Sequence, residues 1–188
     1  DLSAFSGLGV PHISTYSLIL ESGSILGVRG YQEASQDVQA DMYEAILDAL
    51  RKKGYRRYEV SNFALKGSES RHNRTYWKDE EYYGAGLGAS GYVGGVRYTN
   101  VRSLPLYIKN ARKRETEEVV SKDDDLRYFL LTNLRLEEGF REIDFEKRFH
   151  SPFLEKCPKA AALQERGLLV ATNDRWACTD RGLLLLDS

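Results

Sequence analysis

An amphipathic segment between two β-rich runs constrains the fold most strongly. From Ser35 to Lys53 apolar side chains recur at the period of one helical face, and Gly54 supplies a C-terminal stop. The runs on either side, residues 12–20 and 58–64, are rich in β-branched and aromatic residues. A strand, a helix and a strand in this order predict a crossover with two parallel strands and a right-handed connection. The chain is therefore expected to contain part of an α/β domain.

The last third of the chain has a different pattern. Its predicted elements are helices over 126–136, 143–149 and 153–164, a hairpin over 168–179 and a short last helix over 180–186. Helices followed by a two-stranded wing predict a small winged-helix-like α+β domain. The charged stretch 115–125 predicts a linker before it, so we expect two domains, 1–120 and 121–188.

Charge, hydropathy and cysteine content exclude several classes of protein. The chain has 27 Lys and Arg against 28 Asp and Glu, so it has no overall basic field to attract nucleic acid. Its apolar runs are far shorter than the ~20 residues of a membrane span. Cys157 and Cys178 are not spaced for a zinc ribbon or a disulfide framework. We expect a cytoplasmic protein without a nucleic-acid partner or stable membrane insertion.

Four special side chains, His72, Asn73, Tyr76 and Trp77, lie within six residues of one another beside the glycine-rich stretch 84–92. An imidazole can ligate heme iron, a Tyr can hydrogen-bond the heme, and an indole can stack on a macrocycle. The pattern alone favours a structural interpretation, in which the aromatics are core residues and His and Asn cap a turn. Four glycines in eight residues indicate a close backbone approach. The chain has no P-loop, catalytic triad or HExxH pattern.

A series of segments carries a family resemblance. They are His12-Ile13-Ser14-Thr15-Tyr16-Ser17-Leu18, Tyr58-Glu59-Val60-Ser61-Asn62-Phe63-Ala64, His72-Asn73-Arg74-Thr75-Tyr76-Trp77 and Glu81-Tyr82-Tyr83-Gly84-Ala85-Gly86-Leu87-Gly88-Ala89. In order and spacing they resemble the oxygen-independent coproporphyrinogen III oxidase-like family of radical S-adenosylmethionine (SAM) proteins. Within that family the HNxxYW motif, here residues 72–77, is typical of the heme chaperones and is associated with heme binding.

The resemblance implies a fold and two cofactors. The fold is the C-terminal part of a partial (β/α) radical-SAM barrel, followed by the winged-helix-like domain. In the full-length family members the barrel holds a [4Fe-4S] cluster and SAM, but the CxxxCxxC cluster ligands are absent here, so we expect the C-terminal half of such a protein. By position, the backbone at Ala64 would contact SAM. The chain departs from the family at Ser90, where many relatives have His, and at Asn133, where a glycine is common.

Two functions follow from the resemblance. In the first, the parent protein is a heme chaperone that transfers heme to acceptor proteins. His72 is then the candidate ligand of the heme iron, and Asn73, Tyr76 and Trp77 complete the heme site. In the second, it is an enzyme that decarboxylates coproporphyrinogen III through a SAM-derived radical. The HNxxYW motif argues against this second function. Open strand edges in an isolated half-barrel also predict a homo-oligomer.

Overall fold

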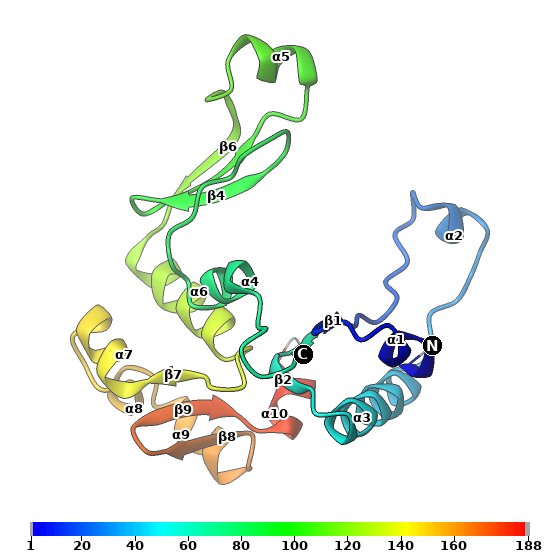
Figure 1. Cartoon of the computed structure of the whole chain (residues 1–188). Helices are drawn as coiled ribbons and strands as arrows, with labels where there is room; N and C mark the ends of the chain where they lie inside the picture. The colour runs from blue at the N-terminus through cyan, green and yellow to red at the C-terminus, as the bar shows by residue number, and fades with distance from the viewer. Residues whose placement is uncertain (1, 187–188) are drawn as a thin grey trace. The chain divides into compact units, whose positions relative to one another are not determined.

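The computed structural model describes residues 2–186 and has a mixed α/β fold (Figure 1). Over these residues it forms three antiparallel sheets of three strands each. The chain divides into two compact units between Glu69 and Ser70, and each unit is described by itself. No helix within the described range is long and apolar enough to cross a membrane.

In the first unit a long amphipathic helix packs against a small sheet. The helices are α1 (Leu2–Gly7), α2 (Ile25–Val28) and α3 (Gln36–Lys52), and the strands are β1 (His12–Ser14), β2 (Arg56–Glu59) and β3 (Asn62–Ala64). The hydroxyl of Ser35 accepts a hydrogen bond from the Val38 amide and begins α3, while Gly54 follows its end at φ +85°. The core combines side chains from the helix and the sheet, namely Ile13, Leu47, Leu50, Tyr55 and Phe63. The predicted helix is thus confirmed.

The predicted parallel pair of strands is wrong. Residues 58–64 do not form one strand but the turn and arms of a hairpin, in which β2 and β3 run antiparallel. The returning arm β3, and not β2, pairs with β1, so that Ile13 lies opposite Phe63 in an antiparallel register. β1 also ends at Ser14 instead of residue 20, because β3 offers only three residues to pair with. Sequence order therefore predicted the helix but not the strand directions.

The second unit begins with a helix and a three-stranded sheet. These elements are α4 (Arg71–Trp77), β4 (Ser90–Val93), β5 (Val96–Asn100), α5 (Leu104–Lys109) and β6 (Arg114–Val119), with the sheet order β4-β5-β6. Gly94 and Gly95 form the turn between β4 and β5, and both adopt positive φ. The predicted linker over 115–125 is wrong, since its first half is β6, an exposed and highly charged strand paired with β5.

The unit ends with helices that pack on a second small sheet. Its elements are α6 (Lys122–Asn133), β7 (Phe140–Arg141), α7 (Glu142–Phe149), α8 (Phe153–Lys156), α9 (Lys159–Glu165), β8 (Leu169–Thr172), β9 (Arg175–Cys178) and α10 (Asp180–Leu184). The predicted hairpin and last helix are confirmed, and the Thr179 hydroxyl caps α10 by accepting from the Gly182 amide at 3.0 Å. The single helix predicted over 153–164 is instead two short helices, since Pro158 disfavours helix in the residue before it.

An aromatic cluster forms the core beneath these helices. Phe129, Phe140, Phe145 and Phe153 contact one another edge to face or tilted, with ring centroids 5.1 to 5.7 Å apart. Trp176 of β9 packs on Phe153 at 5.0 Å. Such pairs contribute stability beyond the area that they bury. The last third of the chain therefore has a hydrophobic core of its own.

Candidate functional site

Helix α4 carries all four predicted heme-site residues. The Ser70 hydroxyl caps the helix by accepting from the Asn73 amide at 3.2 Å, and the seven residues that follow form nearly two helical turns. Side chains four positions apart lie on one helical face. His72 therefore shares a face with Tyr76, and Asn73 shares the neighbouring face with Trp77. The structure brings together the four residues that sequence predicted.

His72 presents its imidazole to solvent at the start of a row of aromatic rings. The imidazole is exposed and meets the edge of the Tyr76 ring, with centroids 4.5 Å apart and planes at 82°. The Tyr76 ring in turn contacts the Tyr82 ring, with centroids 4.2 Å apart. Burial raises the pKa of Tyr82 above its ordinary value, so this phenol stays protonated at neutral pH. The row limits the positions that the His72 ring can take while leaving its outer face open to a flat ligand.

The opposite face of α4 is held by ion pairs. Arg74 donates to the Glu138 carboxylate at 2.6 Å, and the Lys78 ammonium lies 3.7 Å from the same carboxylate. On the face of Asn73 and Trp77, the Arg135 guanidinium lies over the indole ring of Trp77, 5.4 Å from its centroid. Because Arg135 and Glu138 both lie in the segment between α6 and β7, this segment fixes how α4 is rotated.

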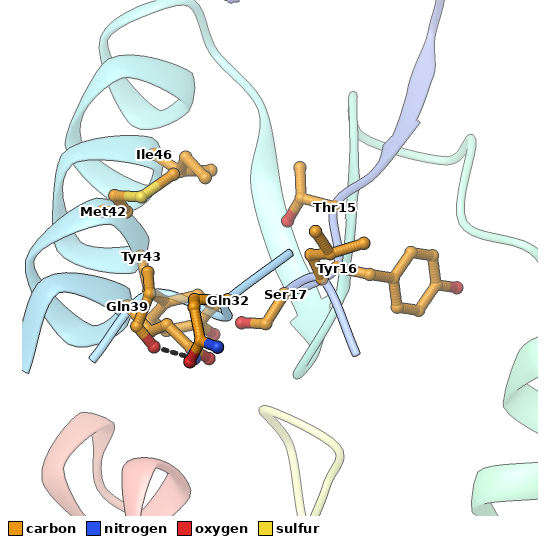
Figure 2. Close-up of a pocket in the computed structure, with 10 residues that line it drawn as sticks. Thr15, Tyr16, Ser17, Gln32, Gln39, Met42, Tyr43 and Ile46 are labelled. Carbon is orange, nitrogen blue, oxygen red and sulfur yellow. Dashed lines mark hydrogen bonds between the residues drawn. The ribbon is translucent and has the colours of Figure 1, made fainter. Parts of the chain in front are cut away.

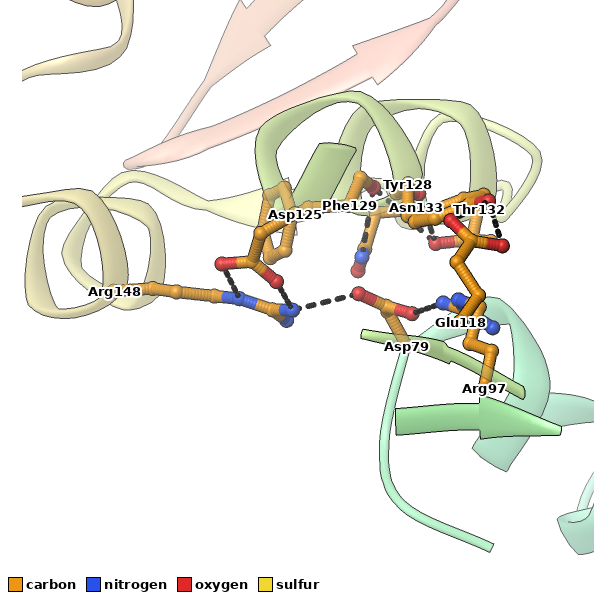
Figure 3. A network of polar contacts seen from close by, with 9 residues as sticks. All are labelled: Asp79, Arg97, Glu118, Asp125, Tyr128, Phe129, Thr132, Asn133 and Arg148. Atoms are coloured by element: carbon orange, nitrogen blue, oxygen red, sulfur yellow. Dashed lines mark hydrogen bonds and ion pairs between the residues drawn. The ribbon is translucent and has the colours of Figure 1, made fainter. Parts of the chain in front are cut away.

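A buried ion-pair network begins where α4 ends (Figure 3). Asp79, at a left-handed φ of 54°, is buried and accepts hydrogen bonds from Arg97 of β5 and from Arg148 of α7, the latter at 2.7 Å. Arg148 also pairs with Asp125 of α6. The Arg97 guanidinium stacks over the Tyr128 ring at 4.1 Å. The network joins β5, which precedes residue 121, to α6 and α7, which follow it. The division into domains 1–120 and 121–188 stays a prediction.

The glycine-rich stretch is used inside its own unit. The amides of Gly84 and Gly86 each donate at 3.0 Å, to the hydroxyls of Tyr98 and Tyr107 respectively. The Asn100 side chain donates to the carbonyls of the same two glycines. The close approach that the glycines indicate is thus made to neighbouring side chains of strand β5 and helix α5.

The predicted SAM contact lies in the first unit. Ala64 is buried at the end of β3, between His12 of β1 and Arg56 of β2. Close by is a buried carboxylate that sequence reasoning missed, that of Glu59, which accepts from the Asn62 side chain and, at 3.2 Å, from the Ser61 amide. The sequence feature that could have indicated this buried carboxylate is a charged residue within the β-rich run 58–64.

Two cavities lie outside the α4 site. The first, of about 410 Å³, lies between α3 and the segment after β1, with Thr15, Ser17, Gln39 and Met42 among its lining residues (Figure 2). The second, of about 420 Å³, is in the second unit beside the end of α4, and Lys78 and Glu138 are among its lining residues. None of the predicted site residues lines either cavity.

The cysteines of the chain do not fit a [4Fe-4S] cluster. Such a cluster takes three or four thiolates, whereas Cys178 is buried in β9 and Cys157 follows α8. Burial raises the pKa of the Cys157 thiol and so keeps it protonated. Within residues 2–186, no three side chains of His, Cys, Asp or Glu are placed to hold a metal ion.

Comparisons with known proteins agree with this architecture. Residues 120–185 match the family described as the HemN C-terminal domain. The chain is 42% identical to the heme chaperone HemW of Lactococcus lactis, covering 98% of this chain and 51% of that protein. Identity to HemW of Bacillus subtilis is 34%, over 95% of this chain and 49% of the relative. The chain thus spans about half the length of the curated relatives it matches.

A solved structure has the same fold. The structure titled "Coproporphyrinogen III oxidase (HemN) from Escherichia coli is a Radical SAM enzyme" matches with a TM-score of 0.75 over 98% of this chain and 48% of that one. The two sequences are 16% identical, so the likeness establishes the fold alone. The expected fold class is thereby confirmed.

Proposed function

Because the chain belongs to the oxygen-independent coproporphyrinogen III oxidase-like family of radical-SAM proteins, we propose that it is the heme-binding part of a heme chaperone. The parent protein would act in the cytoplasm and deliver heme to acceptor proteins. The relatives named as heme chaperones support the proposal, because the matches cover nearly all of this chain. The observation that carries it is the exposed imidazole of His72, backed by an aromatic row.

Heme is the cargo in this proposal, and the chemistry of α4 fits it. A neutral imidazole donates a nitrogen lone pair to heme iron. His72 can reach a flat ligand from solvent because no described side chain covers it, and Tyr76 supports its ring from behind. Asn73 and Trp77, half-buried on the next face, would contact the edge of the macrocycle. An exposed ligand also suits a carrier, because a second protein can approach the same iron during transfer.

The [4Fe-4S] cluster and SAM belong, in this proposal, to the whole protein. When bound, they supply the radical chemistry of the family. The two cysteines of this chain do not fit the cluster, so its ligands would come from another part of the parent protein. The contact between the Ala64 backbone and SAM, at the end of β3, remains part of the proposal.

A hemin titration of the chain and its His72→Ala variant tests the proposal. We expect saturable binding with a Soret shift, and an affinity at least tenfold lower in the variant. His150→Asn is the matched control, because it also removes an exposed imidazole and because Asn tolerates the left-handed φ of 58° at that position. Unchanged affinity in His72→Ala would overturn the assignment of this residue.

The alternative activity, decarboxylation of coproporphyrinogen III, has the structural likeness in its favour. That likeness is to the fold and carries no residue role. An assay of the full-length parent for SAM-dependent conversion of coproporphyrinogen III separates the two activities. Turnover of coproporphyrinogen III by the parent protein, together with absence of hemin binding by the wild-type chain, would favour the decarboxylase activity.

A further inference from the structure

The connection between β5 and β6 is a basic tip. Residues 102–114 contain five basic side chains and no acidic one, in a chain whose net charge is −1. We call these thirteen residues the basic tip. They carry helix α5 beyond the end of the β4-β5-β6 sheet, away from α4 and α6 of the same unit (Figure 1). The composition of the tip is therefore set apart from that of the chain as a whole.

The tip has a defined conformation. Its base is closed by the Val101 amide, which donates to the Lys113 carbonyl at 3.3 Å, and by a turn in which the Lys113 amide donates to the Asn110 carbonyl at 3.0 Å. From its middle, the Tyr107 hydroxyl accepts from the Gly86 amide. Arg114 stacks on the Tyr98 ring, 3.6 Å from its centroid. The remaining side chains are thus presented from a fixed backbone.

Large apolar side chains point into solvent from this backbone. Leu104 is 54% exposed, Leu106 is 41% exposed and Ile108 is 75% exposed. Leu104 and Ile108 are one helical turn apart, so they share a face of α5. These three exposed apolar side chains lie on the same short segment as the basic ones.

The cations around these side chains are available for a partner. Within residues 2–186, the side chains of Arg102, Lys109, Arg112 and Lys113 form no ion pair. The carboxylates that follow in β6 have other partners than these four side chains. Glu115 accepts from the backbone amide of Arg102 at 3.4 Å, Glu117 pairs with Arg114 at 2.8 Å, and Glu118 accepts from the Tyr128 hydroxyl at 3.1 Å. The partner must therefore combine negative charge with an apolar layer.

We propose that the basic tip docks the protein reversibly on the surface of an anionic lipid bilayer. Headgroup phosphates would pair with the four cations while the leucine and isoleucine side chains enter the boundary of the acyl chains. A single-stranded nucleic acid offers the same negative charge, but it is bound through aromatic side chains that stack on bases. The aromatic side chain of α5, that of Tyr107, is instead turned inward to Gly86.

Vesicle co-sedimentation of the whole 188-residue chain tests the proposal. We expect binding to vesicles of phosphatidylglycerol and phosphatidylcholine, much weaker binding to phosphatidylcholine alone, and release at high salt. The triple variant Lys109→Glu, Arg112→Glu and Lys113→Glu should lower the affinity at least tenfold. A matched control, Lys156→Glu with Lys159→Glu and Arg166→Glu, makes the same change in net charge at exposed positions in α8, in α9 and directly after α9. It should bind within twofold of wild type.

The apolar contribution is tested separately. Ile108→Ser should weaken vesicle binding several-fold, whereas Val119→Ser, which replaces a residue 79% exposed at the far end of β6, should not. Circular dichroism checks that each variant folds. Absence of wild-type binding, equal loss in the tip variant and its control, or binding to RNA in place of vesicles would each overturn the proposal.

Discussion

Replacing Asp79 by Asn tests whether the buried ion-pair network stabilises the second unit. The Asp79 side chain is 2% exposed, and its carboxylate faces the guanidinium groups of Arg97 and Arg148. Asn keeps the shape and tolerates the left-handed backbone, so the substitution removes the charge and replaces one of the two acceptor oxygens by an NH2 group. Breaking a fully buried ion pair costs ~3–5 kcal/mol. Because the two arginines remain 22% and 26% exposed, we expect the free energy of unfolding to fall by ~2–3 kcal/mol.

Thermal unfolding followed by circular dichroism measures this loss. For a unit of this size ~4 °C per kcal/mol applies, so the melting temperature should fall by about 10 °C. Asp174→Asn is the matched control, because Asp174 also has a positive φ, 68°, but lies exposed in the β8–β9 turn. If Asp79→Asn lowers the melting temperature no more than Asp174→Asn does, the reasoning about the network is refuted.

Three further predictions concern packing, pH and assembly. Gly139→Ala should lower the free energy of unfolding in urea by about 3 kcal/mol, because the new Cβ would clash with the Trp176 carbonyl at a residue with positive φ. Gly167 also has a positive φ but lies in open space, so Gly167→Ala should lower it by only ~1 kcal/mol. Equal losses in the two variants would contradict this. Burial raises the pKa of Tyr82 and Tyr92, so their stabilising effect is complete below pH ~10 and is lost as pH rises through the folded-state pKa. Stability that is unchanged between neutral and strongly alkaline pH would count against it. The isolated chain should scatter light as a homodimer or larger oligomer, and a monomer mass at micromolar concentration would argue otherwise.

The elements that sequence predicted correctly are those with local signals. Helix α3 has an amphipathic period, a serine cap and a glycine stop, and the β8–β9 hairpin has a turn at Asn173 and Asp174. The pairing of β1 with β3 depends instead on residues about fifty positions apart, and nothing in either strand encodes the direction of its partner. Strand β6 was missed because all six of its residues are exposed, so it lacks the alternation of a half-buried strand.

In the candidate site, too, the features with a local sequence signal were predicted and those made by distant residues were not. The HNxxYW motif marked His72 and Tyr76, and their spacing of four put them on one face once α4 formed. The ion pair between Arg74 and Glu138, and that between Asp79 and Arg148, join residues more than sixty positions apart. Charged residues of this kind look like solvated surface in a sequence, because only the tertiary fold decides which of them are buried. The support behind α4 could therefore not be predicted.

Low-temperature electron paramagnetic resonance of the ferric heme complex tests the central claim most directly, because it reports the axial ligand of the iron. If His72 ligates the iron, a histidine-ligated signal is expected in the wild-type chain and in His150→Asn, and its loss in His72→Ala. The same signal in all three proteins, or its loss only in His150→Asn, would contradict heme ligation by His72.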